Sequence, residues 1–344
     1  MSRATVLSGV GAALPTGILT NDMLTQRMDT SDEWITSRTG IRERRIIEPG
    51  TATGDLAVEA GREALGSARM TAVDAVVLAT TTPDYVCPAT APSVAARLGL
   101  GEIPAYDVSA VCSGFLYGLA TGTGLISAGI ADSVLVVGAE AFSTIVDPYD
   151  RNTAPIFGDG AGAVVLRAGD GSQPGRLLDF ELGSDGALMD LIIVPAGGAV
   201  QRSSGAAAAA ADHFIKMQGR SVYRQAVLRM VKSSEAVLAK TGWDVDHVDW
   251  LVGHQANVRI LQAVADRLGL PSDKLIVNLA TRGNTAAASI PLALAEAAQA
   301  GQFAPGDRIL LAAFGGGATW GAATLDWPSI PTRPEGNRLE LSRS

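Results

Sequence analysis

The sequence is poor in cysteine and in charged residues, and each shortage excludes a class of protein. Two cysteines in 344 residues are too few for the disulfide framework of a secreted domain. Only 18% of the residues are charged and 47% are hydrophobic, which excludes a disordered chain. The net charge of −8 argues against a nucleic-acid-binding protein, because phosphate neutralisation needs a basic surface.

The N-terminus shows no secretory signal, and with so few cysteines we expect a cytoplasmic protein. One uncharged stretch, from Val108 to Ala131, is long enough to span a bilayer. It is interrupted by serine, threonine and glycine, and it follows a strand-like segment that ends at Asp107. These features predict a buried central helix instead of a membrane span.

Nucleotide-binding loops are also missing. The stretch GVGAALP at 9–15 lacks the third glycine of a dinucleotide fingerprint. The stretch GDGAGA at 158–163 precedes a strand-like segment instead of opening a helix, and neither carries the GK[ST] of a phosphate loop.

What the sequence does contain is a regular alternation of short apolar runs with alanine-rich helical stretches, which predicts an α/β protein with a buried sheet. The stretch 196–211 is predicted to be a loop that leads into a helix, and the polar tail 328–344 to be flexible. The expected strands are 5–9, 75–79, 133–137, 163–166, 250–252 and 309–313.

The chain repeats itself. VDAVV at 73–77 and VDWLV at 248–252 each open a segment that closes with a matching helix end, AARLGL or ADRLGL. Cys112 in the first copy and Asn284 in the second each lie 17 residues before the glycine of an Ala-Gly pair. The pattern predicts two duplicated halves, 1–170 and 171–327, with these two residues at equivalent helix starts.

Cys112 is the first candidate for chemistry, because it stands where a strand gives way to an apolar helix. A thiol at a helix N-terminus experiences the positive end of the dipole, so we expect a lowered pKa and a nucleophilic thiolate that can carry an acyl group. A lone buried cysteine is more often inert, and this alternative stays open on the residue alone.

His254 and Asn284 are the other two candidates. His254 lies just past a predicted strand, whereas His213 and His247 have the sequence surroundings of surface residues. Taken singly, His254 is as often structural as catalytic, and Asn284 is a plausible helix cap. Taken with Cys112, the three residue types form a coherent catalytic set.

Eight motifs, in order over about residues 3–327, resemble β-ketoacyl-(acyl carrier protein) synthase III. They are TSDEWITSRTGIRER (30–44), the segment around Cys112, IFGDGAGA (156–163), GSDG (183–186), KMQGRSVY (216–223), GHQAN (253–257), GNTAAAS (283–289) and FGGG (314–317). The resemblance implies a thiolase-like, duplicated five-layer αβαβα fold, usually assembled as a homodimer.

The resemblance also implies a mechanism. Cys112 takes a starter acyl group from acyl-CoA, with the backbone N–H groups of Cys112 and Gly316 as the oxyanion hole. His254 and Asn284 then hydrogen-bond the thioester of malonyl-acyl carrier protein, which loses CO₂ and attacks the acyl-Cys carbonyl. Such charge development needs preorganised neutral donors in a water-poor site. No metal or redox cofactor is implied.

Further residues match binding positions of the family. Trp34, Arg38 and Arg151 would hold the adenine and phosphate end of CoA, and Arg224, Arg259 and Arg267 would form a basic face for an acidic carrier protein, although Asp266 weakens this patch. The implied acyl pocket consists of Thr81, Cys87, Phe142, Phe157, Ile215 and Phe314, of which Phe314 would shield the site.

Cys87 departs from the family pattern, since it stands where members with a small pocket have phenylalanine, donated across the dimer interface. We therefore predict starters longer than acetyl, in either fatty-acid synthesis or polyketide priming. The alternatives are an acyltransferase of the same fold that uses hydroxyl or amine acceptors, and a non-catalytic acyl-CoA-binding protein. A biosynthetic thiolase fits less well, because Cys87 is not in the motif of a second catalytic cysteine.

Overall fold

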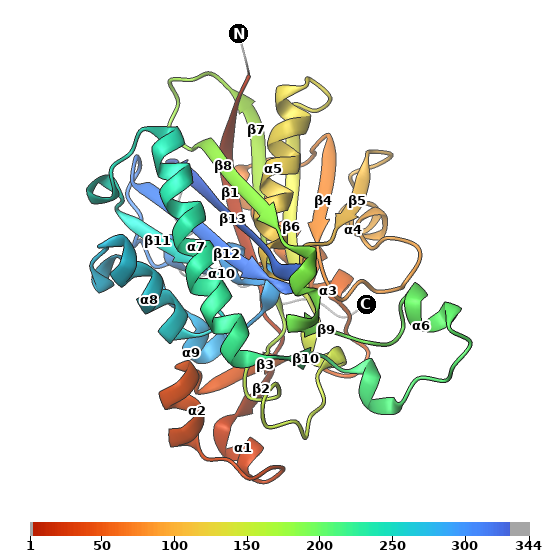
Figure 1. Cartoon of the computed structure of the whole chain (residues 1–344). Helices are drawn as coiled ribbons and strands as arrows, with labels where there is room; N and C mark the ends of the chain where they lie inside the picture. The colour runs from red at the N-terminus through yellow and green to blue at the C-terminus, as the bar shows by residue number, and fades with distance from the viewer. Residues whose placement is uncertain (1–2, 331–344) are drawn as a thin grey trace.

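The protein is described by a computed structural model over residues 3–330, and its centre is a nine-stranded mixed sheet flanked by helices (Figure 1). All six predicted strands belong to this sheet. The nine strands are β1 (Ala4–Ala13), β4 (Ala75–Ala79), β5 (Ala105–Val108), β6 (Ser133–Glu140), β7 (Gly160–Gly169), β8 (Arg176–Ser184), β11 (Trp250–Gly253), β12 (Arg308–Gly315) and β13 (Thr319–Asp326).

The sheet consists of two similar halves. In the first, with order β5-β4-β6-β7-β1, β4 is parallel to β5 and β6, and β7 is antiparallel to β6 and β1. In the second, β11 is parallel to β12, and β13 is antiparallel to β12 and β8. An isolated parallel bridge at Leu275, beside β11, occupies the place of β5. The halves join through two residue pairs of β1 and β8.

Ten α-helices, several short 3₁₀ turns and two small two-stranded sheets complete the described chain. The helices are α1 (Asn21–Thr25), α2 (Asp32–Thr39), α3 (Thr53–Ala68), α4 (Ala91–Arg97), α5 (Gly114–Ser127), α6 (Ala199–Ser203), α7 (Gly219–Thr241), α8 (Val258–Leu268), α9 (Leu279–Arg282) and α10 (Ser289–Gln299). The small sheets pair β2 (Gly17–Thr20) with β3 (Glu43–Ile46), and β9 (Ile192–Ile193) with β10 (Lys216–Met217).

Three large apolar clusters show how the layers are stacked. One cluster joins α3 and α4 to the outer face of the first half-sheet, and another joins α7 and α8 to the outer face of the second. The largest contains α5 and α10 together with strands of both halves. Two central helices therefore lie between two half-sheets that each carry an outer helical layer, and the predicted five-layer duplicated fold is confirmed.

The central helix α5 packs closely because glycines line its sheet-facing side. A Cβ at Gly118 would lie 3.0 Å from a methyl carbon of Val136, and one at Gly122 would lie 3.0 Å from Leu166. Spaced four residues apart, these glycines lie on one face of the helix. The uncharged stretch 108–131 is thus a buried central helix, as predicted. Within residues 3–330, no helix is long and apolar enough to cross a membrane.

Two expectations have other outcomes. The stretch 196–211 was expected to be a loop leading into a helix, but it contains the short helix α6, and its end overlaps a 3₁₀ turn, Ala210–His213. Its small side chains bury little apolar surface, so none of the residues of α6 is buried. The predicted flexible tail lies outside the described residues from 331 onward.

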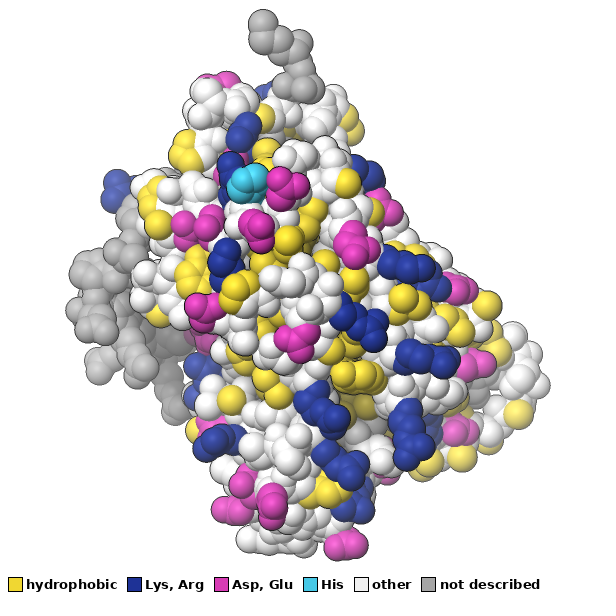
Figure 2. Space-filling view, turned by 60° about the vertical axis from the view of Figure 1, so that its left-hand side comes forward, with side chains coloured by type: hydrophobic (Ala, Val, Ile, Leu, Met, Phe, Trp, Pro, Cys, Tyr) yellow, Lys and Arg dark blue, Asp and Glu magenta, His cyan; other side chains and the backbone are white. Residues whose placement is uncertain are grey.

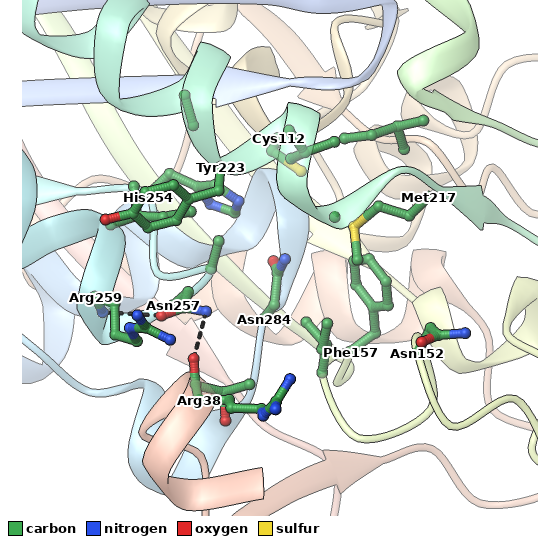
Figure 3. A pocket seen from close by; sticks show the side chains of 18 of the residues that line it. Arg38, Cys112, Asn152, Phe157, Met217, Tyr223, His254, Asn257, Arg259 and Asn284 are labelled. Atoms are coloured by element: carbon green, nitrogen blue, oxygen red, sulfur yellow. Dashed lines mark hydrogen bonds between the residues drawn. The ribbon is translucent and has the colours of Figure 1, made fainter. Parts of the chain in front are cut away.

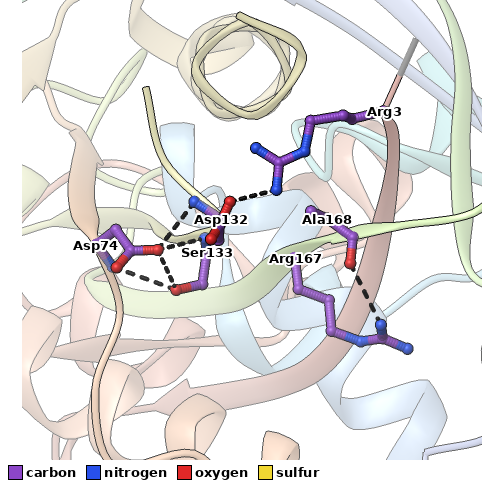
Figure 4. A network of polar contacts seen from close by, with 6 residues as sticks. All are labelled: Arg3, Asp74, Asp132, Ser133, Arg167 and Ala168. Atoms are coloured by element: carbon purple, nitrogen blue, oxygen red, sulfur yellow. Dashed lines mark hydrogen bonds and ion pairs between the residues drawn. The ribbon is translucent and has the colours of Figure 1, made fainter. Parts of the chain in front are cut away.

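A polar network fixes the starts of the strands, at the end of the sheet remote from Cys112 (Figure 4). The carboxylate of Asp74, just before β4, accepts both backbone N–H groups of Asp132 and Ser133, at 2.9 and 2.8 Å, and the Ser133 hydroxyl at 2.9 Å. Asp132 in turn pairs with Arg3 before β1. The loops of the candidate active site leave the sheet at the opposite ends of the strands.

Candidate active site

A cavity of about 690 Å³ opens at the carboxyl ends of β5, β11 and β12. Ligands of open α/β sheets bind at such ends, because the loops that leave parallel strands meet there. Cys112, His254 and Asn284 all line this cavity, and their side chains face one common space at its inner end (Figure 3). The three predicted catalytic residues are therefore brought together from both halves of the fold.

Cys112 sits in a 3₁₀ turn, Val111–Ser113, that runs directly into α5. Val111 has a φ of +48°, a left-handed conformation that is strained for a β-branched residue. This bend at the end of β5 turns the thiol toward the cavity, although Cys112 is only 5% exposed.

The expected lowering of the pKa of Cys112 is wrong. Burial and, second, the carboxylate of Glu140 raise the pKa of the thiol above its ordinary value, and the backbone N–H groups of Cys112 and Gly316 offset only part of the rise. Removing a thiolate from water costs more than these two N–H groups return. Cys112 is therefore a protonated thiol at neutral pH and must lose its proton as it attacks.

His254 directly follows β11, and hydrogen bonds hold both its backbone and its ring. Its backbone N–H donates to the carbonyl of Ala312 on β12 at 2.8 Å. Its Nδ1 lies 2.7 Å from the hydroxyl of Ser289, the first residue of α10. Burial lowers the pKa of the imidazole to about 3, so the ring that faces the cavity is neutral.

Asn284 is oriented by its own backbone and by a segment of the first half. Its N–H donates to the carbonyl of Ile156 at 2.9 Å, and its carbonyl accepts the N–H of Gly158 at 3.0 Å. The side-chain Oδ1 accepts the N–H of Ala286 at 2.9 Å. With the oxygen occupied by a donor, the amide Nδ2 is the atom presented to the cavity.

The predicted oxyanion-hole loop lies against the nucleophile. A Cβ at Gly315 would lie 2.7 Å from the backbone nitrogen of Cys112, so only glycine permits this approach. The Ser113 hydroxyl donates to Thr319 Oγ1 at 2.7 Å, and this threonine also lies 3.0 Å from the carbonyl of Gly316. The buried hydroxyl of Ser113 and the half-buried hydroxyl of Thr319 thus connect the nucleophile turn to the loop that carries Gly316.

The mouth of the cavity holds the predicted CoA-binding residues. The guanidinium carbons of Arg38 and Arg151 lie 4.7 and 4.3 Å from the ring centroid of Trp34. Arg220 and Arg259 also line the cavity, and among the described residues no aspartate or glutamate does. Four cations and a half-buried tryptophan ring suit a ligand with phosphates and a planar base.

The three residues of the predicted carrier-protein face are exposed. Arg259 is at the cavity mouth, Arg224 follows the lining residue Tyr223 on α7, and Arg267 lies farther along α8. Figure 2, which turns the side of the molecule with α8 and α2 forward, shows lysine and arginine side chains gathered on the lower half of this face. None of the three arginines forms an ion pair within residues 3–330.

The predicted acyl-pocket residues separate into three groups. Phe142, Phe157 and Phe314 line the cavity, and the first two rings stack with centroids 4.4 Å apart. Ile215 packs in the same apolar cluster as Cys112 without lining the cavity. Thr81 and Cys87 lie on the loop after β4, away from the cavity lining, and Cys87 is exposed in the single chain.

Sequence reasoning missed two residues of this site. Ser289 was quoted only as the end of GNTAAAS, and its signal is its position five residues after Asn284 at the start of the second central helix. Glu140, at the end of β6, is fully buried and accepts the Thr81 N–H at 3.1 Å and the Thr82 hydroxyl at 2.8 Å. Burial raises the pKa of Glu140 to about 7.

Comparison with known proteins gives one consistent result. The model of the C-terminal part of 3-oxoacyl-[acyl-carrier-protein] synthase III matches residues 238–327, and a second model of the same synthase matches residues 106–186.

Within the described part of the chain, no group of three or more His, Cys, Asp or Glu side chains is placed to hold a metal ion.

Full-length relatives agree with the family models. β-Ketoacyl-[acyl-carrier-protein] synthase III 3 of Streptomyces coelicolor is 58% identical over 332 residues, covering 96% of this chain and 99% of the relative. The crystal structure of 3-oxoacyl-(acyl carrier protein) synthase III from Pseudomonas aeruginosa has a TM-score of 0.90 at 51% identity, covering 96% and 100%. The priming β-ketosynthase of the R1128 polyketide pathway has a TM-score of 0.88 at 30% identity, covering 96% and 98%.

Proposed function

The chain belongs to the β-ketoacyl-(acyl carrier protein) synthase III family, and from that premise we propose that Cys112, His254 and Asn284 carry out its decarboxylative condensation. The observation that carries these roles is the convergence of the three side chains at the inner end of one cavity with an arginine-lined mouth. Acyl-CoA and malonyl-acyl carrier protein are the two substrates of this synthase.

The first half-reaction transfers the starter. The sulfur of Cys112 attacks the carbonyl of acyl-CoA, and the oxyanion accepts hydrogen bonds from the backbone N–H groups of Cys112 and Gly316. The bond to the CoA sulfur then breaks, and the thiol proton leaves with it as the free CoA thiol. Because the pKa of Cys112 is raised, proton loss accompanies the attack and does not precede it.

The second half-reaction forms the carbon–carbon bond. His254 and Asn284 donate hydrogen bonds to the thioester oxygen of malonyl-acyl carrier protein, and the bond to the carboxylate breaks to release CO₂. The electron pair left behind is held as an enolate, which attacks the carbonyl of acyl-Cys112 and expels its sulfur. Two neutral donors suit this step, since they stabilise negative charge only as it develops.

The experiment that tests these roles follows both half-reactions in one enzyme preparation. Intact-protein mass spectrometry after incubation with acyl-CoA should show one acyl group, which is absent from Cys112→Ala. Radioactive CO₂ release from malonyl-acyl carrier protein should then depend on His254 and Asn284. Acylation without CO₂ release would indicate an acyltransferase of the same fold, and an adduct that survives Cys112→Ala would refute the nucleophile.

The starter preference depends on Cys87, which lies exposed at the tip of a loop between Thr82 and Thr90. Asp84 fixes one side of this loop by accepting the Gly54 N–H at 2.8 Å, and Asp107 fixes the other by accepting the Thr90 N–H at 2.8 Å. We propose that the chain forms a homodimer in which this loop reaches the partner's acyl pocket, where a thiol in place of an aromatic ring admits starters longer than acetyl.

A starter panel tests this part separately. Propionyl-, butyryl- and isobutyryl-CoA should acylate Cys112 faster than acetyl-CoA, and Cys87→Phe should reverse the order. Equal or faster reaction with acetyl-CoA in the unmodified enzyme would overturn the proposal, as would a monomer by light scattering.

We also propose that the protein works in the cytoplasm, where its two unpaired cysteines stay reduced, and that it needs no cofactor.

A further inference from the structure

Within residues 3–330, Ser289 supplies the one hydroxyl that hydrogen-bonds the ring of His254. Its Oγ lies 2.7 Å from Nδ1, and the two side chains are 1% and 4% exposed. Ser289 opens α10, and Asn284 lies five residues earlier, just before the 3₁₀ turn that leads into this helix. One short segment, 284–289, therefore carries one of the two groups proposed to bind the malonyl thioester and contacts the other.

The direction of the hydrogen bond between Ser289 and His254 follows from counting hydrogens. A serine hydroxyl has one hydrogen to donate and two lone pairs that accept. The backbone N–H of Gln255 can only donate, and it already points to Ser289 Oγ at 3.4 Å. Within residues 3–330, the Gln255 N–H and His254 Nδ1 are the two hydrogen-bond partners of Ser289 Oγ.

If Nδ1 carried the ring hydrogen, Oγ would accept twice and its own hydrogen would be buried without an acceptor. Such a hydroxyl is unfavourable in a protein interior. If the hydroxyl donates to Nδ1 instead, every hydrogen has a partner. The ring hydrogen is then on Nε2, because burial keeps the imidazole neutral and a neutral ring carries one hydrogen.

We infer that Ser289 is a positioning residue that fixes His254 in the Nε2–H form, so that the histidine donates to the substrate thioester and does not accept from it. Asn284 is set in the same way, since the Ala286 N–H occupies its oxygen and leaves Nδ2 to donate. The two donors are thus preset by neighbours on one segment, 284–289. The consequence for catalysis rests on the proposed function, while the hydrogen position does not.

Gln255 supports this arrangement from the other side. Its side-chain amide donates to the carbonyls of Gly253 at 2.7 Å and Ile276 at 3.0 Å, and its Oε1 accepts the N–H of Asn278 at 3.1 Å. These three bonds hold the backbone that precedes and follows His254. The ring is therefore fixed against Ser289 by a rigid segment, and not by a flexible side chain.

The hydrogen position is tested on the intact enzyme by ¹⁵N NMR of histidine-labelled protein. The chain has three histidines, and His213→Gln and His247→Gln, both exposed positions, assign the remaining ring. We expect a pyrrole-type shift for Nε2 and a pyridine-type shift for Nδ1 of His254. The reverse pattern overturns the inference, whatever the catalytic role of His254 is.

The catalytic consequence is tested with Ser289→Ala, which should lower CO₂ release about 10- to 100-fold while acyl-Cys112 forms at an unchanged rate. Ser289→Thr, which keeps a hydroxyl, should restore CO₂ release. Ser234→Ala is the matched control, because that hydroxyl is buried on α7 and has no hydrogen-bond partner among the described residues, so its loss should change neither step. An equal loss in acylation and CO₂ release, or no loss in either, contradicts the positioning role.

Discussion

The starts of the two central helices, α5 and α10, have the same backbone design and different chemistry. Each is reached through a 3₁₀ turn containing a residue in the left-handed conformation, Val111 at +48° in the first and Ala286 at +44° in the second. Each helix is followed by a glycine in that conformation, Gly129 or Gly301. Duplication has thus produced two equivalent bends that aim a residue at one cavity.

The two bends differ in which atoms they present. At the first, a side chain reacts and backbone N–H groups stabilise the charge that develops beside it. At the second, neighbouring groups fix the side chains that act: the Ala286 N–H orients Asn284, and the Ser289 hydroxyl contacts His254. The first bend forms a nucleophile and the second forms a pair of donors, so substitutions at each bend should lower the rate of a different half-reaction.

The largest expected effect is a separation of the half-reactions. Cys112→Ala should abolish the acyl adduct, because Cys112 is the one thiol that the described chain places in its own cavity and against the loop that carries Gly316. His254→Ala and Asn284→Ala should each lower CO₂ release by about 10² to 10⁴ while acylation changes little. Stopped-flow acylation with mass detection, beside CO₂ release, measures both. Loss of acylation in the donor variants would show that the two bends act as one unit.

Gly315→Ala should affect the first bend more than the second. The added Cβ would lie 2.7 Å from the backbone nitrogen of Cys112 and 2.9 Å from that of Ser113, so the turn must shift. A displacement of about 1 Å at a reacting centre costs on the order of 100-fold in rate. We expect that loss in acylation. Gly66→Ala, on α3 with no atom near the added Cβ, should leave acylation unchanged.

Low pH should distinguish the two donors, because the free energy of unfolding depends on the titration of His254 but not on Asn284. Burial lowers the pKa of His254 to about 3, whereas an unfolded histidine titrates near ~6.5. Below that value the unfolded chain binds a proton that the folded chain excludes, so stability falls as the pH drops, by up to about 1.4 kcal/mol per pH unit. His254→Gln should remove this loss.

Urea unfolding at about pH 7 and about pH 5 measures the effect. His247→Gln is the control, because that side chain is exposed and should leave the acid sensitivity as it is. Asn284→Ala should also leave it unchanged, since an amide does not titrate in this range. Equal acid sensitivity in His254→Gln and the unmodified protein would contradict a neutral, buried imidazole.

The smallest expected effect concerns Glu140, whose charge raises the pKa of the Cys112 thiol. Glu140→Gln removes the charge and keeps the shape, so the thiolate fraction should rise and alkylation of Cys112 by iodoacetamide should be a few-fold faster at a fixed pH near 8. In the unmodified protein the alkylation rate should keep rising with pH beyond ~8.5, the pKa of an ordinary thiol. A plateau below that pH would contradict the raised pKa.

Much of the fold could be predicted because its signals are local. Apolar runs of strand length alternate with helical stretches, and the matching spacings from Cys112 to Gly129 and from Asn284 to Gly301 indicate the duplication. The predicted equivalence of Cys112 and Asn284 is wrong in detail, because the left-handed residues Val111 and Ala286 correspond, and Ala287 therefore takes the place of Cys112 two residues before its helix. The segment 196–211 was predicted less well, because an alanine-rich stretch without an apolar face does not say how it ends. Strands β8 and β13 were not predicted either, and their pairing joins segments far apart in the chain.

The sequence by itself determined which residue types stand at the two helix starts and which motifs accompany them. The tertiary structure decided the state of those residues. The pKa of Cys112 depends on burial by distant segments and on Glu140, and the orientation of His254 depends on Ser289, 35 positions away. Local patterns place a side chain on an element, but desolvation and hydrogen-bond direction are set by whatever the fold packs against it.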